Sequence, residues 1–428
     1  MTHYGIGGLI FIVILFPVSL LRSAELDAAF FQMLADFSPE TWDSLQDSQE
    51  PAAEQIRIFT HLIDRMKERV PDDVLDENAR KNEMQTVHSR GMIFRCRGTV
   101  TRVQKRESLY RVEMNPQENG SQRVIVFTDR VPEKWTSQET LSEPAGFTGL
   151  LVKTAEGAEI YLAKRMKWYP RDDFLGEKGY DVGLFDLIRQ PPVTAFRGHR
   201  EKFLFGDQDR VPFFSLLQTL REHSGSHELQ RKSADFLKRS QLTAAQLMVE
   251  LFNHPEKYQG TCVTMTGRVK RLTRMDVKNA GDRKYFGLDH YFLLFLFNED
   301  TQQNPVVFCV TELPPGMPAG ENSSSLEYNE LVRCSGVFYK TWAYPIHLPQ
   351  ENDTGKTAVK PATQLAPMMV GVGVTWYPEE SGTGSDANPP SLTWGLGVFC
   401  GFAVIWLCLL RIKSRSKKPE FRIGKPKE

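Results

Sequence analysis

Hydrophobic residues recur at intervals of three and four positions in two parts of the chain, the spacing that buries one face of an α-helix. In residues 25–90 this pattern is carried by Leu26, Phe30, Phe31, Leu34, Ile56, Phe59, Ile63 and Met66. In residues 176–255 it is carried by Phe213, Leu216, Leu217 and Leu220. We therefore expect a helical cap over residues 25–90 and a helical linker over residues 176–255.

Between and after these parts, apolar and polar residues alternate in short runs with a period of two, which indicates β-strands. Arg95, Arg97 and Thr99 occupy alternate positions of one such run, and Asn119-Gly120 is a typical turn between two runs. The pattern predicts a first β module over residues 91–175 and a second over residues 256–380.

The two β modules follow one template. The landmarks of the first are Gly98-Thr99-Val100, Val126-Phe127, residues 149–153 and Trp168-Tyr169-Pro170. Those of the second, in the same order, are Gly267-Arg268-Val269, Val307-Phe308, residues 336–340 and Trp376-Tyr377-Pro378. Four landmarks in one order predict a duplication. The second module is longer, and its surplus around residues 279–282 and 350–363 is polar, so we expect loops there.

The opening of the second module resembles a known fold family. Residues 251–260 followed by residues 263–269 are similar to the start of oligonucleotide/oligosaccharide-binding (OB) folds in bacterial envelope proteins, where a helix and an N-P-x-x-Y-x-G turn lead into a strand of the form V-x-V-x-G-x-V. The first module has His88-Ser89-Arg90-Gly91 in place of that turn. A glycine within the first strand, such as Gly98 or Gly267, would permit the bend that this strand needs.

The resemblance implies an α+β fold: two OB-like antiparallel β-barrel modules with helical cap and linker segments, plus terminal hydrophobic spans. As a whole the chain resembles membrane-anchored bacterial proteins with tandem OB-fold-like modules. That group brings no established activity with it.

The two ends of the chain predict membrane attachment. Residues 392–410 contain no charged residue and match the length of a transmembrane helix. The tail at 411–428 has eight basic and two acidic residues, so it is expected in the cytoplasm and the rest of the chain outside. Residues 381–391 form a flexible stalk. Residues 1–24 are either a signal peptide or an N-terminal anchor. The expected location is the cytoplasmic (inner) membrane, with the bulk of the chain extracytoplasmic or periplasmic.

No catalytic or cofactor motif is present, because the sequence has no G-x-S-x-G, Walker loop, G-x-G-x-x-G or H-E-x-x-H. His223 and His227 are four residues apart, but Ser-Gly-Ser lies between them and no third metal ligand is near in sequence. We expect no enzyme, no cofactor and no metal. Cys309 and Cys334 flank strands of the second module and form either a disulfide or two separately buried thiols.

Basic and aromatic residues on the strands are the candidate binding residues: Arg97, Arg102, Tyr110, Arg268, Arg271 and Tyr285. Arginine could contact phosphates and tyrosine could stack on bases. The same alternation also describes an ordinary solvated face of a sheet. Trp168 and Trp376, at equivalent ends of the modules, are expected to be hydrophobic plugs.

The chain has 53 basic and 53 acidic residues, so it lacks the strongly basic balance of a dedicated nucleic-acid binder. The leading functional hypothesis is a membrane-anchored extracytoplasmic scaffold or binding protein that docks a protein or envelope-polymer partner through the OB-like modules, above all through loops of the second. One alternative is single-stranded nucleic-acid binding at the cell envelope. Another is an unrecognised metal-dependent hydrolase that uses His223 or His227.

Overall fold

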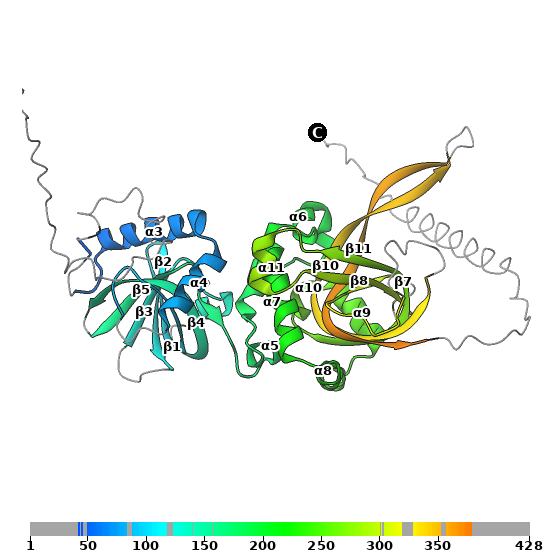
Figure 1. Ribbon diagram of the computed structural model, residues 1–428, viewed down its shortest axis with the longest axis horizontal. Helices are drawn as coiled ribbons and strands as arrows, with labels where there is room; N and C mark the ends of the chain where they lie inside the picture. Colours follow the sequence, from blue (N-terminus) through cyan, green and yellow to red (C-terminus); the bar gives the residue numbers. More distant parts are fainter. Residues whose placement is uncertain are drawn as a thin grey trace, which may run out of the picture. The chain divides into compact units, whose positions relative to one another are not determined.

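The computed structural model describes residues 42, 44–45, 49–83, 88–117, 123–138, 140–155, 157–299, 301, 304–318, 328–351 and 357–378. The expected N-terminal segment at 1–24, stalk at 381–391, transmembrane helix at 392–410 and basic tail at 411–428 lie outside these residues. No helix in the described part of the chain is long and apolar enough to cross a membrane. The expected α+β class is confirmed, because the chain contains two β-sheets together with helices (Figure 1).

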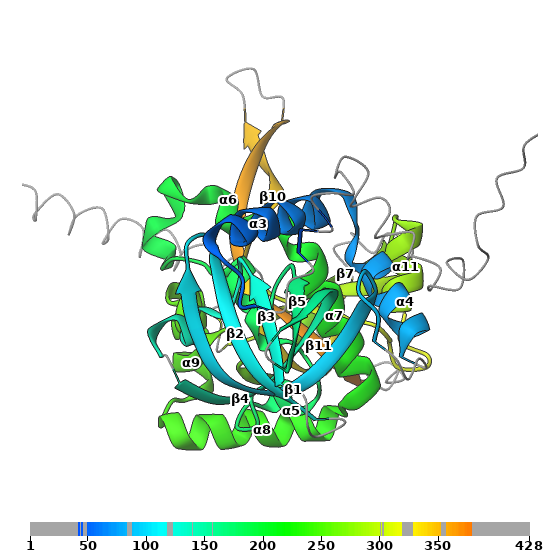
Figure 2. The ribbon, with the colours of Figure 1, turned by 90° about the vertical axis from the view of Figure 1, so that its left-hand side faces the viewer.

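The first sheet follows two helices along the chain. The helices are α3 (Ala53–Arg69) and α4 (Asp72–Asn82). The strands are β1 (Ile93–Arg106), β2 (Leu109–Pro116), β3 (Arg123–Thr128), β4 (Thr140–Ala155), β5 (Ala158–Ala163) and β6 (Lys167–Trp168). A 3-10 helix, η2 (Glu133–Ser137), lies between β3 and β4. Figure 2 shows α3 lying across the strands of this sheet.

Short and medium helices connect the two sheets. They are α5 (Phe174–Glu177), η3 (Val182–Ile188), η4 (Val193–Gly198), α6 (Arg200–Phe203), α7 (Asp207–His223), α8 (Ser226–Ser240), α9 (Ala244–Asn253) and α10 (Pro255–Tyr258). The second sheet comprises β7 (Cys262–Asp276), β8 (His290–Phe297), β9 (Val306–Val310), β10 (Glu330–Glu351) and β11 (Thr357–Tyr377), with α11 (Ala280–Phe286) between β7 and β8.

The two sheets share one strand order. The first runs β1-β2-β3-β5-β4-β6, and β1 also pairs with β4, so each of the strands β1 to β5 has at least two neighbours. The second is a closed ring in the order β7-β8-β9-β11-β10. Neighbouring strands are antiparallel except at one equivalent place in each sheet, where β3 runs parallel to β5 and β9 parallel to β11. The purely antiparallel arrangement expected from the sequence therefore needs this one correction in each sheet.

Local details of the first strand are repeated as well. The register of β1 shifts between Val100 and Arg102, and that of β7 shifts between Val269 and Arg271. Two residues before each shift stands a glycine, Gly98 or Gly267. A Cβ atom would lie 2.1 Å from the Asn115 carbonyl oxygen at Gly98 and 2.6 Å from the Phe297 carbonyl oxygen at Gly267. Only glycine permits the neighbouring strand to approach so closely.

Trp168 and Trp376 also occupy equivalent positions. The Trp168 indole donates to Glu143 Oε2 at 3.0 Å, and the Trp376 indole donates to Glu330 Oε2 at 2.7 Å. Both side chains are half-buried and pack against a hydrophobic cluster inside their sheet. Each tryptophan therefore packs against a hydrophobic cluster, as expected, and also donates a hydrogen bond to a glutamate.

Part of each sheet is buried on both faces. In the second sheet, Phe308, Phe338 and Met369 form a cluster with Leu251 of α9. Val307 and Cys309, on the other face of β9, pack against Leu216 of α7. All five residues of β9 are buried, which explains why Val306–Val310 is a continuous apolar run rather than an alternating one.

Two sequence expectations are wrong. The polar stretch at 279–282 begins helix α11, because the Asn279 side chain accepts hydrogen bonds from Gly281 N and Asp282 N. The stretch at 350–363 is mostly strand, where β10 and β11 pair with each other as far as Glu351↔Thr357 and form a two-stranded ribbon. Of the two alternatives for Cys309 and Cys334, the structure has the two separately buried thiols. Both are free, they lie on strands β9 and β10 that β11 separates, and they belong to different hydrophobic clusters.

Candidate functional site

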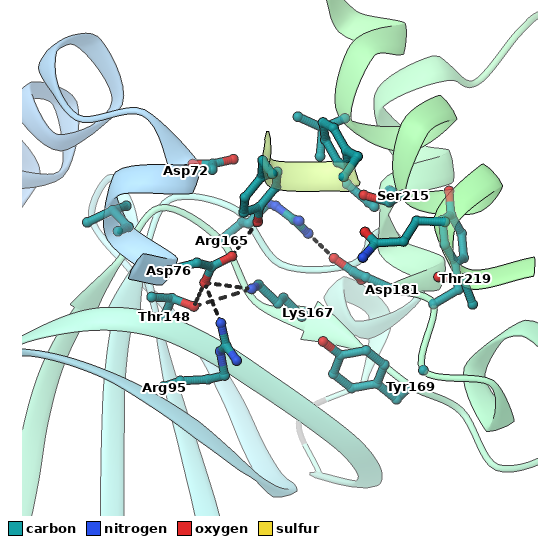
Figure 3. Close-up of a pocket in the computed structure, with 18 of the residues that line it drawn as sticks. Asp72, Asp76, Arg95, Thr148, Arg165, Lys167, Tyr169, Asp181, Ser215 and Thr219 are labelled. Carbon is teal, nitrogen blue, oxygen red and sulfur yellow. Dashed lines mark hydrogen bonds and ion pairs between the residues drawn. The ribbon is translucent and has the colours of Figure 1, made fainter. Parts of the chain in front are cut away.

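A polar cavity of about 1050 Å³ lies between two walls of the chain (Figure 3). One wall comes from the first sheet and its helices, and includes residues of α4, β1, β4 and the β5–β6 connection. The other comes from α5, η3, α7 and α11. Nine of the lining residues are Lys or Arg and five are Asp or Glu: Lys67, Arg80, Arg95, Arg97, Arg130, Lys164, Arg165, Lys167, Lys178, Asp72, Asp76, Glu177, Asp181 and Glu222.

Asp76, on α4, is the centre of a hydrogen-bonded network in this cavity. Its Oδ1 accepts a hydrogen bond from Thr148 Oγ1 at 2.7 Å and lies 3.4 Å from Arg95 Nη2 and 3.5 Å from Lys167 Nζ. Its Oδ2 accepts from the Tyr285 hydroxyl of α11. The Asp76 side chain is 8% exposed, so the carboxylate and its two cations form a largely desolvated cluster.

Neighbouring positive charge and hydrogen bonds keep the Asp76 carboxyl ionised. Burial by itself would raise the pKa of the Asp76 carboxyl, but the charge of Lys167 and the hydrogen bond from Tyr285 outweigh it, so the pKa lies well below its ordinary value. Burial also lowers the pKa of Lys167, and Asp76 opposes that shift. The charge on Asp76 is therefore what favours the protonated form of Lys167.

A second ion pair joins the β5–β6 connection to η3. The Arg165 guanidinium donates to Asp181 Oδ2, while Asp181 Oδ1 accepts from Trp168 N at 2.8 Å and Gly183 N at 3.1 Å. Burial opposes the charge of Arg165, but Asp181 outweighs burial and the pKa of Arg165 is raised. This pair fixes the connection between the first sheet and the helical linker.

A third pair lies at the start of α4. Lys164 Nζ donates to Asp72 Oδ1 at 2.7 Å. Burial would raise the pKa of Asp72, but the contact with Lys164 outweighs burial and lowers it. Asp72 and Asp76 are four residues apart on one helix, so both face the cavity.

Three of the cavity cations have no such partner. Among the described residues, Arg80, Arg97 and Arg130 form no ion pair with a carboxylate. Arg97 lies over the ring of Tyr169, with its guanidinium carbon 5.2 Å from the ring centre. Burial, reinforced by Asp181, raises the pKa of Tyr169 to about 12, so its hydroxyl keeps its proton and can donate a hydrogen bond.

A second, smaller cavity of about 490 Å³ lies at the β1–β2 turn and η2. Its lining includes Lys105, Arg106, Tyr110 and Trp135. The Lys105 ammonium lies 4.7 Å from the centre of the Tyr110 ring. Basic and aromatic side chains are therefore adjacent here as well.

The candidate residues from the sequence divide among four places. Arg97 and Tyr285 line the large cavity. Tyr285 lies on helix α11 rather than on a strand, and its hydroxyl donates a hydrogen bond to Asp76. Tyr110 lines the smaller cavity. Arg102 is exposed on β1 after the register shift.

Arg268 and Arg271 lie on β7, away from both cavities. Arg268 donates to the Asn329 carbonyl oxygen at 3.0 Å, and Arg271 lies over the Phe295 ring at 5.1 Å. The six candidate residues therefore do not form one continuous binding surface.

The sequence reasoning missed Asp76, Arg165 and Lys167, which form the best-defined interactions of the large cavity. Two signals were available. Asp72 and Asp76 recur at helical spacing, and the run Lys164-Arg165-Met166-Lys167 is densely basic. Neither signal shows that helix α4 and the basic run at 164–167 lie next to each other in the fold.

His223 and His227 lie on either side of a break between two helices. Helix α7 ends at His223 and α8 begins at Ser226, so the Ser-Gly-Ser segment breaks the helix as predicted. In the part of the chain that the structure describes, no three His, Cys, Asp or Glu side chains gather as metal ligands do.

Comparison of the chain with protein-family models gave no match, and a search of the curated proteins gave none either.

Proposed function

We propose that this protein is a non-enzymatic, membrane-anchored binding protein that docks an anionic partner in the large cavity. The observation that carries the proposal is the excess of basic residues in the cavity lining, nine against five, together with three arginines that have no carboxylate partner. A cluster of like charges is costly for a folded chain, so it is usually retained where a ligand of opposite charge binds.

The chain as a whole is neutral, with 53 basic and 53 acidic residues, so the local excess is not a by-product of composition. The sequence pointed instead to loops of the second module as the docking site. We place the site in the large cavity because the unpaired cations gather there.

We further propose that both sheets are OB folds. The order β1-β2-β3-β5-β4 closing on β1, with the third strand parallel to the fifth, supports this assignment for the first sheet, and the second sheet repeats it. The hydrophobic segment at 392–410 and the basic tail at 411–428 support an anchor in the cytoplasmic membrane, with the cavity on the extracytoplasmic side.

Thermal unfolding of the full-length chain in detergent, with tripolyphosphate or hexaglutamate at constant ionic strength, tests the docking proposal. We expect both polyanions to raise the melting temperature, because a ligand that binds only the folded state stabilises it. Arg97→Glu should abolish the shift. Arg102→Glu, on the same strand but outside the cavity, should retain it. No shift, or an equal shift in both variants, would rule out the cavity as the docking site.

Single-stranded nucleic acid is a second candidate ligand, and the smaller cavity supports it. Lys105, Arg106 and Tyr110 combine cations with an aromatic ring, as single-strand binding surfaces do. Fluorescence anisotropy with labelled oligothymidylate discriminates the two proposals. Binding that falls steeply with salt and is lost in Tyr110→Ala, but not in Arg97→Glu, would favour nucleic acid.

A further inference from the structure

The two walls of the large cavity differ in chemistry, and this difference constrains the ligand. Eight of the nine cations belong to the wall formed by residues 67–169. The opposite wall contributes only one cation, Lys178, together with the carboxylates Glu177, Asp181 and Glu222 and the apolar side chains Leu184, Leu187, Val211 and Phe286. A ligand that satisfies both walls has its anionic group toward the first wall and a body without negative charge toward the second.

The cations left for a ligand are all arginines. Lys67, Arg95, Lys164, Arg165, Lys167 and Lys178 each have a carboxylate within ion-pair distance. Arg80, Arg97 and Arg130 have none among the described residues. A guanidinium presents paired N–H groups that match two oxygens of a phosphate or carboxylate. Three guanidinium groups carry more charge and more N–H donors than one carboxylate can use, and Arg97 lies over the ring of Tyr169, whose protonated hydroxyl can donate as well.

The opposite wall also offers hydroxyl and amide groups beside its apolar surface. Ser215, Gln218 and Thr219 lie on α7 at helical spacing, and all three line the cavity. Figure 3 shows Ser215 and Thr219 on the far side of the cavity from Asp76 and Arg95. Alternating hydroxyl donors and apolar or aromatic side chains are suited to a polyhydroxylated body such as a sugar ring.

We propose that the cavity binds a phosphomonoester on a sugar or similar polyol, with the phosphate dianion toward Arg97 and Arg130 and the hydroxylated body along α7. This inference rests on the proposed function, because it names the chemical class of the anionic partner. A cavity of about 1050 Å³ has room for a group of this size. The phosphate can belong to a free sugar phosphate or to the end of a phosphorylated polymer.

Isothermal titration calorimetry of the full-length chain in detergent tests the inference with glucose 6-phosphate, glucuronate, inorganic phosphate and glucose. We expect glucose 6-phosphate to bind about tenfold or more tightly than glucuronate. Its affinity should rise by up to about tenfold from pH 5 to pH 8, because the second phosphate pKa lies near 6. Arg97→Gln should weaken it about tenfold or more, and Arg102→Gln should leave it unchanged.

Ser215→Ala separates recognition of the body from recognition of the phosphate. We expect this variant to bind glucose 6-phosphate more weakly and to bind inorganic phosphate with unchanged affinity. Phosphate-terminated dextran distinguishes the two sources of the ligand. If it binds as tightly as glucose 6-phosphate, the site accepts polymer ends; if it is excluded, the site takes the free compound.

Two failures have different meanings. If glucuronate and glucose 6-phosphate bind equally well and both are weakened by Arg97→Gln, the cavity is an anion site but the phosphomonoester assignment is overturned. If no anion binds, or if Arg97→Gln and Arg102→Gln behave alike, the proposed function fails as well.

Discussion

Asp76 shows how one buried carboxylate can position cations from separate elements. It contacts Arg95 on β1, Lys167 on β6 and Tyr285 on α11, while lying itself on α4. Each cation is partly desolvated, with 32% of the Arg95 side chain and 21% of the Lys167 side chain exposed. Removing the negative charge of Asp76 would leave Arg95 and Lys167 without this counter-charge. Burial already lowers the pKa of Lys167, so Lys167 depends on that counter-charge to stay protonated.

Asp76→Asn is therefore expected to lower the free energy of unfolding by about 2 kcal/mol at pH 7, as measured by urea denaturation. The effect should depend on pH. The pKa of Asp76 is lowered in the folded state from its ordinary 3.8, so its charge stabilises the fold above that value and the contribution is lost as the pH falls further. The difference between Asp76→Asn and wild type should shrink below pH 3.8. A difference of the same size throughout the acid range would contradict this account.

The cysteines give a second prediction for single residues. Burial raises the pKa of Cys262 to about 12 and that of Cys309 and Cys334 further, whereas Cys96 is only half-buried. Because the thiolate is the reactive form, iodoacetamide at pH 8 should label Cys96 about ten times faster or more than these three in the folded chain. Peptide mapping by mass spectrometry measures the rates. A peptide that joins Cys309 to Cys334 without reducing agent would show that the two are bonded.

The repeated first strand is the clearest feature among the elements. Gly98 and Gly267 both stand two residues before a register shift, where the facing carbonyl oxygen leaves no room for a Cβ atom. The bend depends on this close approach, and the rest of each sheet closes around the bent strand.

Gly98→Ala and Gly267→Ala should each destabilise the chain by about 2–3 kcal/mol, because the backbone must move to relieve the clash. Gly198→Ala is the matched control, since nothing lies within 4 Å of a Cβ there. Denaturant titration of the three variants provides the comparison. If Gly98→Ala cost no more than Gly198→Ala, close packing would not explain the glycine.

The pairing of β10 with α7 depends on a buried charge. Lys340 Nζ donates to Asp209 Oδ1 at 2.9 Å, both side chains are 0% exposed, and Lys340 also donates to the Leu204 carbonyl oxygen at 2.8 Å. Asp209 in turn accepts hydrogen bonds from Tyr339 and from Gly206 N. The ion pair thereby orients the start of α7 against the second sheet.

Lys340→Met should cost about 3–5 kcal/mol, because it leaves the Asp209 carboxylate buried without a counter-charge. Lys340→Met with Asp209→Asn should cost less than the sum of the two single changes, as a double-mutant cycle on unfolding would measure. Strictly additive costs would mean that the two charges do not interact.

The sequence predicted the helices and strands better than the tertiary contacts between them. Strand periodicity and the shared template located the strands around Gly98, Gly149, Gly267 and Gly336, because these patterns are local. Helix α11 was missed because it is short and its burial depends on contacts with α7 and α4. The cavity was missed for the same reason: Asp76, Arg95, Lys167 and Tyr285 are distant along the chain, and only the fold brings them together.

At the scale of the whole molecule, the central feature is an uneven distribution of charge within a neutral chain. Nine basic and five acidic residues line the large cavity, although the chain has 53 of each. The ion pairs of Asp72, Asp76 and Asp181 offset part of that charge and position the wall. The arginines that remain account for the proposed affinity for an anionic partner.

The most direct test is to locate a bound oxyanion. Crystals of the full-length protein soaked in tungstate, a tetrahedral dianion with strong anomalous scattering, would show where such a group binds. The account predicts an anomalous peak inside the large cavity, within hydrogen-bond distance of Arg97 or Arg130, that disappears in Arg97→Gln. Peaks confined to arginines outside the cavity, such as Arg102 or Arg268, with the cavity empty, would contradict it.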